Sequence, residues 1–169
     1  LAKDMTDQPV MVNRKGGYLF AKGTLPLLLE AKELPHPPTL IFTGATGSLK
    51  GSANFSAFAT GKFALRALAQ SLAREFGPKG VHVSHVIIDG IIDIPRTKAW
   101  KLEHEDAKLD PQAVSIRKPS RRCFRKLICQ SQIAESYWHL HTQPRTTFGF
   151  ELDLRPYMEN GKTHSADNS

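Results

Sequence analysis

The sequence predicts an α/β fold in which a parallel β-sheet lies between two layers of helices. Segments of helical and strand-like character alternate along the chain, and two of the strand-like runs are short and almost entirely apolar. Long connections separate these runs, as parallel strands require, and strands of this kind are buried on both faces. Because such crossovers are right-handed, the sheet and its helices would form three layers.

The first half of the chain supplies two predicted helices and one predicted strand. Residues Gly17 to Lys32 have the pattern of a helix, in which Pro26 implies a kink or a late start. Thr39 to Thr43 is an apolar run suited to a buried strand, and the glycine-rich loop from Gly44 to Gly51 follows it. Apolar residues at helical spacing predict a helix from Ser56 to Phe76, ended by glycine and proline.

The second half of the chain adds two predicted strands and a short helix. Val81 to Ile88 is rich in β-branched residues and predicts a second buried strand, after which Asp89 and Gly90 turn the chain. We expect a short helix from Ile133 to His141 and a last strand from Phe148 to Leu154.

The composition is that of one globular domain. No apolar run approaches the ~20 residues of a membrane span, and the first residues lack the apolar stretch of a signal peptide. The two cysteines, Cys123 and Cys129, form neither a disulfide framework nor a zinc set, which indicates free thiols in a cytoplasmic protein. We expect one partial domain over residues 1–158 and a disordered tail over residues 159–169.

Phe58 and Lys62 are the most informative pair in the sequence. They stand four residues apart, so they share one face of the predicted helix. A tyrosine at position 58, with its phenol acidified by the lysine ammonium, would be a proton donor for carbonyl reduction. Phenylalanine has no such proton. The chain therefore has the scaffold of an oxidoreductase site without its acid.

The stretch from Thr39 to Gly90 resembles the second half of a short-chain dehydrogenase/reductase. That family has a strand, a loop with a catalytic serine, a helix with Tyr-x-x-x-Lys and a strand that ends against the nicotinamide. The resemblance covers residues 12–110 and 133–157. It implies a Rossmann-like fold and hydride transfer between NAD or NADP and a small carbonyl or alcohol. The first βαβ unit, with its Thr-Gly-x-x-x-Gly-x-Gly loop, is missing, so the fold would be N-terminally truncated.

The resemblance also implies roles for individual residues. Lys62 fits the lysine that holds the nicotinamide ribose, and Phe58 stands in the place of the tyrosine. The position of the serine falls on Ala45, with Thr46 close by. Asn13 matches the helix asparagine that positions a water in the proton relay. The plain alternatives are a solvated lysine and a core phenylalanine.

The end of the second predicted strand would contact the cofactor through Asp89, Gly90 and Ile92. Asp89-Gly90 replaces the Pro-Gly that is usual in the family, and a turn-forming role for Asp89 is the alternative. Residues 43–51 imitate a dinucleotide-binding loop, but residues 64–71 lack the acidic residue that such a loop requires.

The histidines do not predict a metal site. His82 and His85 lie three residues apart on a predicted strand, so their side chains would point to opposite faces. His139 and His141 either share one face of a strand or splay on a helix.

A basic segment, residues 114–132, interrupts the family pattern. It holds six of the chain's 23 lysines and arginines and no acidic residue, and the flanking sequences join smoothly without it. Its ends can be encoded by splice-boundary codons, so we interpret it as a retained in-frame intron. A dominant transcript that contains these codons would contradict this. The alternative is a loop that binds nucleic acid or an acidic membrane and projects ahead of the last helix.

Three hypotheses about function follow. The first is a weakly active or inactive fragment of an NAD(P)-dependent enzyme, in which only Thr46, Ser48 or a water could donate the proton. The second is a non-catalytic pseudoenzyme or interaction module, which would form a homo-oligomer through helices 17–32 and 56–76 with Phe63 exposed. The third is a chain that does not fold alone, because one edge of its sheet is uncovered.

Overall fold

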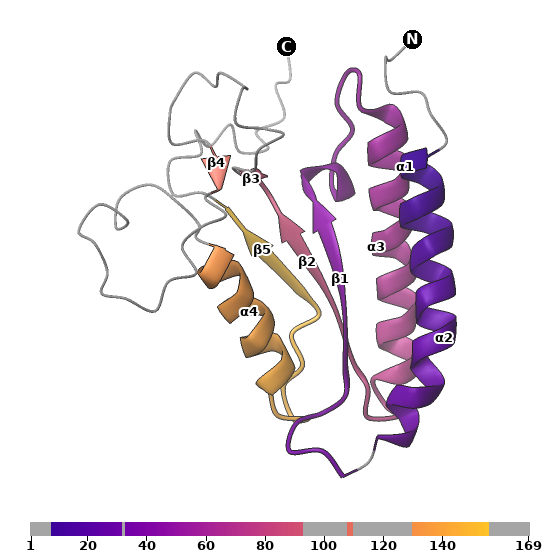
Figure 1. Cartoon of the computed structure of the whole chain (residues 1–169), viewed down its shortest axis with the longest axis vertical. Coiled ribbons are helices and arrows are strands. Elements are labelled where there is room, and N and C mark those ends of the chain that lie inside the picture. Colours follow the sequence, from indigo (N-terminus) through magenta and orange to yellow (C-terminus); the bar gives the residue numbers. More distant parts are fainter. Residues whose placement is uncertain (1–7, 32, 93–107, 110–129, 156–169) are drawn as a thin grey trace, which may run out of the picture. The chain divides into compact units, whose positions relative to one another are not determined.

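A three-stranded parallel sheet is the centre of the larger of two units in this chain (Figure 1). The computed structural model describes residues 8–31, 33–92, 108–109 and 130–155. The larger unit comprises Leu1–Asp89 and Ile133–Leu154, and the second comprises Gly90–Gln132 and Arg155–Ser169.

The strands of the sheet are β1 (Thr39–Ala45), β2 (His82–Ile88) and β5 (Glu151–Leu154), in the order β1-β2-β5. All three are parallel, with Phe42 opposite His85 and His85 opposite Glu151. Every residue of β2 is buried, because this strand has a neighbour on each side. This agrees with the predicted parallel sheet and with the apolar character of the second strand.

Helices cover both faces of this sheet (Figure 1). Successive side chains of β1 contact helices on different faces, because successive residues of a strand point to opposite faces of the sheet. Phe42 packs into a core with α2 (Gly17–Glu30) and α3 (Ser56–Phe76). On the other face, Thr43 bonds to Tyr137 of α4 (Gln130–Thr142). The expected three-layer α/β arrangement is therefore present.

The core lies between β1, β2 and the two long helices. The start of α2 can approach α3 closely because Gly17 has no side chain. A Cβ added at Gly17 would lie 2.6 Å from Leu65 Cδ1 of α3. The buried apolar residues of this core are Ala21, Leu25, Leu40, Phe42, Leu65, Ala69, Val81 and Val83.

The predicted start at Gly17 is confirmed for α2, but a helical stretch that was not predicted precedes it. A short α1 (Gln8–Val10) leads into a π-helical turn η1 (Met11–Gly16), which continues into α2. Of the two alternatives for Pro26, a kink or a late start, the late start is wrong, because Pro26 lies inside α2. Packing accounts for the early start: a Cβ added at Gly61 of α3 would lie 2.7 Å from the Pro9 carbonyl oxygen. The glycine thus lets α1 dock on α3.

Other boundaries move by a few residues. β1 runs on to Ala45 rather than ending at Thr43, and β5 begins at Glu151 rather than Phe148. α4 begins at Gln130, so the last three residues of the basic segment belong to a helix and do not loop out. Residues 114–129 of that segment and the tail 159–169 lie outside the described residues.

The second unit contains a small sheet in its described part. β3 (Ile91–Ile92) and β4 (Lys108–Leu109) pair in parallel. Among the helices of the described ranges, none is both long and apolar enough to cross a membrane.

Candidate functional site

The loop that follows β1 carries the first part of the candidate site. β1 ends at Ala45, and the 3₁₀ turn η2 (Thr46–Ser48) follows directly. The ring of Phe58, from α3, lies against this turn, because a Cβ added at Gly47 would be 2.9 Å from Phe58 Cε1. Phe58 therefore faces the turn at the carboxyl end of β1.

Lys62 reaches the same end of β1. Its Nζ donates a hydrogen bond to the Thr43 carbonyl oxygen at 2.8 Å and lies 5.8 Å from the centre of the Phe58 ring. Burial lowers the pKa of the Lys62 ammonium below its usual range. The structure thus brings the two predicted residues together, with the cation within reach of the ring face.

Thr46 and Asp89 form a second pair at the carboxyl ends of neighbouring strands. The Thr46 hydroxyl donates a hydrogen bond to Asp89 Oδ1, and the Asp89 N–H donates to the Leu154 carbonyl oxygen at 2.8 Å. Asp89 is only 6% exposed. Ligands of open α/β sheets bind at this edge, where strands end. The Thr46 proton is thus bonded to Asp89 in this structure, and a role for Thr46 as proton donor to a substrate stays a prediction.

The remaining predicted residues have different surroundings. The Ala45 N–H donates to Ser48 Oγ at 3.1 Å. Asn13, on η1, packs against Gly61 next to Lys62, while its amide donates to the Pro9 carbonyl oxygen at 2.8 Å within its own helix. Gly90 and Ile92 belong to the second unit.

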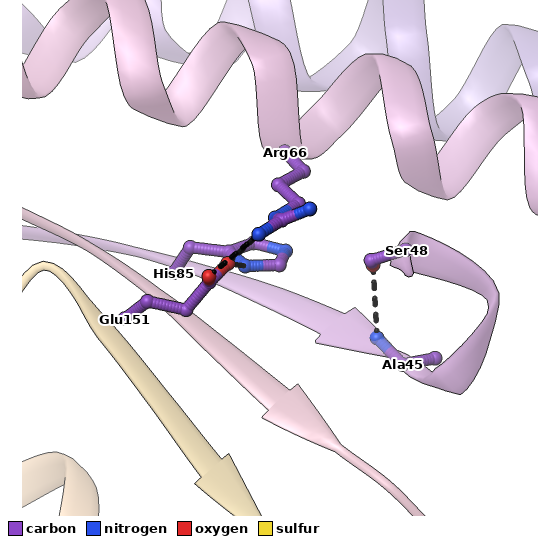
Figure 2. A network of polar contacts seen from close by, with 5 residues as sticks. All are labelled: Ala45, Ser48, Arg66, His85 and Glu151. Carbon is purple, nitrogen blue, oxygen red and sulfur yellow. Dashed lines mark hydrogen bonds and ion pairs between the residues drawn. The ribbon is translucent and has the colours of Figure 1, made fainter. Parts of the chain in front are cut away.

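A network that the sequence did not reveal joins α3, β2 and β5 (Figure 2). Arg66 Nε and Nη2 donate to the two carboxylate oxygens of Glu151 at 2.7 and 2.8 Å. His85 Nδ1 lies 2.9 Å from Glu151 Oε1, so a proton on Nδ1 is donated to the carboxylate. This arrangement leaves His85 Nε2 buried and without a hydrogen-bond partner.

Electrostatics define the charge states of this network. The bond from Arg66 lowers the pKa of Glu151. Burial lowers the pKa of His85 and outweighs the opposing effect of the Glu151 carboxylate. Glu151 is therefore ionised and His85 neutral near pH 7.

Gly44 makes room for the unpartnered nitrogen. A Cβ added at Gly44 would lie 2.3 Å from His85 Nε2 and 2.9 Å from Ser48 Oγ. Ser48, His85 and Glu151 have the residue types of a nucleophilic triad, but no hydrogen bond joins Ser48 Oγ to His85 Nε2. In addition, Ser48 and His85 are fully buried, which excludes attack by this serine on a bound molecule.

His82 and His85 do point to opposite faces of β2, as their spacing predicts. The His82 ring stacks on Phe148 with 4.3 Å between ring centres, and its Nε2 lies 3.0 Å from the Gly149 carbonyl oxygen. Sequence reasoning considered His85 only as a metal ligand. The informative signal was a polar side chain in an otherwise apolar buried strand, which requires a polar partner.

Comparisons with known proteins agree with this fold. Residues 1–105 match the family described as short chain dehydrogenase. No curated protein in the comparison matches the sequence.

Solved structures of dehydrogenases, two of them short-chain dehydrogenases, resemble the chain in fold. One from Rhodopseudomonas palustris is 30% identical, with a TM-score of 0.58, over 91% of this chain and 55% of that one. One from Escherichia coli CFT073, complexed with NADPH, is 24% identical, with a TM-score of 0.58, over 85% and 50%. A 4-hydroxyisoleucine dehydrogenase complexed with NADH and succinate is 15% identical, with a TM-score of 0.60, over 91% and 58%.

The matches cover different shares of this chain and of the proteins that it resembles. The chain spans about half the length of the solved structures that it resembles. The family match, in contrast, covers more than half of the chain itself and includes β1, α3 and β2. On this evidence the chain belongs to the short-chain dehydrogenase family.

Proposed function

We propose that this chain carries the nicotinamide and substrate end of an NAD(P)-dependent oxidoreductase site, with little or no activity of its own. The reaction class is hydride transfer between the cofactor and a small carbonyl or alcohol. One observation carries the proposal: Phe58 and Lys62 lie together against the turn at the carboxyl end of β1. Phe58 cannot donate the proton that carbonyl reduction requires.

Lys62 supports a role for this end of the sheet in holding a nicotinamide ribose. Of the three N–H donors of a lysine, one bonds to the Thr43 carbonyl within the described residues, so the others can bind ribose hydroxyls. The nicotinamide, when bound, supplies the hydride chemistry. The sequence has no Thr-Gly-x-x-x-Gly-x-Gly loop for the pyrophosphate, so we expect weak binding of NAD or NADP.

Exposed apolar side chains support a second candidate function, a non-catalytic interaction module that forms a homo-oligomer. Along the first helical stretch, Val12, Phe20 and Leu27 are 63%, 62% and 65% exposed. Phe63 on α3 is 42% exposed. Exposed apolar patches of this kind often mark protein interfaces.

A nucleotide titration separates the two functions. We expect NADH or NADPH to quench the tryptophan fluorescence of the chain in a saturable way, because Lys62 can still donate hydrogen bonds to the nicotinamide ribose. Light scattering on the same samples reports the oligomeric state. Absence of quenching in a well-defined dimer would contradict the oxidoreductase proposal and favour the interaction module.

Two further parts of the proposal concern residues outside the described ranges. Cys123 and Cys129, as free thiols, support a cytoplasmic location. The basic segment, residues 114–132, of which 114–129 lie outside the described ranges, stays a retained-intron proposal, and nucleic-acid binding is its alternative. We expect a single partial domain over residues 1–158 in either case.

A further inference from the structure

The last strand of the sheet is held by side chains as well as by backbone pairing. β5 has four residues and pairs with β2 alone among the described strands. Glu151, its first residue, accepts two hydrogen bonds from Arg66 of α3 and one from His85 of β2 (Figure 2). We propose that Arg66, Glu151 and His85 form an acid-sensitive latch. The latch holds β5 while the His85 ring carries one proton, and it releases β5 when the ring takes a second proton.

The first argument is the position that a second proton must take. Nδ1 of His85 is committed to Glu151, so the new proton goes to Nε2. That atom is buried and has no partner, and its neighbours are Gly44 and Ser48 Oγ. No hydrogen bond joins Nε2 to Ser48 Oγ, which instead accepts the Ala45 N–H. A buried N–H without an acceptor is costly, so protonation disfavours the closed latch.

The second argument is the charge around the ring. α3 contributes two cations, Lys62 and Arg66, and both raise the cost of a positive His85. β5 contributes Glu151, whose carboxylate is already paired with Arg66. The groups from β1 and η2, Gly44 and Ser48, carry no charge. Burial and the two cations thus lower the pKa of His85, despite the favourable carboxylate.

The sign of the pH effect follows from this lowered pKa. In the open chain the ring takes its second proton near the ordinary pKa of 6.5, whereas in the closed latch it does so only at lower pH. The open state therefore binds more protons below that pH. Above pH 6.5 the latch therefore stabilises β5 fully. Below that pH, the equilibrium constant for closing the latch falls by up to about tenfold per pH unit.

Opening of the latch would also weaken the candidate site, because backbone hydrogen bonds connect the site to β5. The His85 N–H donates to the Phe150 carbonyl and the Asp89 N–H donates to the Leu154 carbonyl, both at 2.8 Å. Release of β5 breaks both bonds. Asp89, which accepts the Thr46 hydrogen bond, then loses its support from β5. This inference concerns stability of the site and does not depend on the proposed function.

Hydrogen exchange of the intact chain tests the latch. Amide protection factors in β5 and β1 are compared at about pH 7.5 and pH 5.5, a range that spans the ordinary titration of histidine. We expect protection in β5 to fall about tenfold at the lower pH while protection in β1 is kept. His85→Asn keeps an N–H for Glu151 but does not titrate, so its β5 protection should be independent of pH. His139→Asn, an exposed change on α4, should behave as the wild type.

Three results would overturn the latch. They are β5 protection that does not change with pH, equal loss of protection in β1 and β5, and the same loss in His85→Asn. Should that variant fail to fold, ¹⁵N NMR of the wild-type ring decides instead. We expect the ring to be mostly neutral, with its proton on Nδ1, at about pH 6.5, since the fold lowers the pKa of His85 below that value. A doubly protonated ring at that pH would refute the proposal.

Discussion

Replacement of Phe58 by tyrosine should raise NADPH-dependent reduction of small ketones and aldehydes by about 10²–10⁴-fold. The new phenol would stand on the face of α3 that already carries Lys62, whose Nζ lies 5.8 Å from the centre of the ring. A nearby ammonium lowers the pKa of a phenol and prepares it to donate its proton. The measurement is the rate of NADPH oxidation with a panel of carbonyl compounds.

Phe63→Tyr is the matched control for this change. Phe63 lies on the same helix but is exposed, so a phenol at that position should leave the rate unchanged. A Phe58→Tyr rate equal to that of the wild type, with the variant folded, would show that position 58 is not in the place of the acid.

Gly44→Ala is the substitution that we expect to destabilise the fold most. The new Cβ would lie 2.3 Å from Nε2 and 2.5 Å from Cε1 of the buried His85 ring, which Glu151 holds from its other side. Neither the ring nor the backbone of β1 can move freely, since both belong to the central sheet. Overpacking of this kind costs about 1–3 kcal/mol or more in the free energy of unfolding.

Urea denaturation followed by circular dichroism measures this cost. Gly51→Ala is the control, because Gly51 is exposed and an added Cβ would meet no atom within 4 Å. We expect the midpoint of Gly51→Ala to match the wild type and that of Gly44→Ala to fall clearly below it. Equal midpoints would mean that His85 does not occupy the space beside Gly44.

The parts of the fold that sequence patterns predicted are those set by local signals. α3 spans Ser56–Phe76 as expected, because its apolar spacing and the following glycine and proline are local features. The buried strands were equally visible as short apolar runs. The start of the first helix at Gln8 was missed, since it depends on docking against Gly61, about fifty positions along the chain.

The candidate site shows the same division. Phe58 and Lys62 were found because they lie on one helix at a helical spacing, and the structure brings them together. The bond from Arg66 to Glu151 joins residues 85 positions apart, and no sequence pattern links them. The hydrogen bond from Thr46 to Asp89 was also missed, because only the paired carboxyl ends of β1 and β2 place the hydroxyl next to that carboxylate.

The affinity of NADPH for the wild type and for Lys62→Ala tests most directly whether the carboxyl end of β1 is a nicotinamide site. Lys22→Ala, an exposed change on α2, is the control. Charge-assisted hydrogen bonds to ribose hydroxyls are worth about 1.5–3 kcal/mol, so their loss should weaken binding at least about tenfold. We predict this loss in Lys62→Ala alone. Equal affinity of all three proteins would contradict the account.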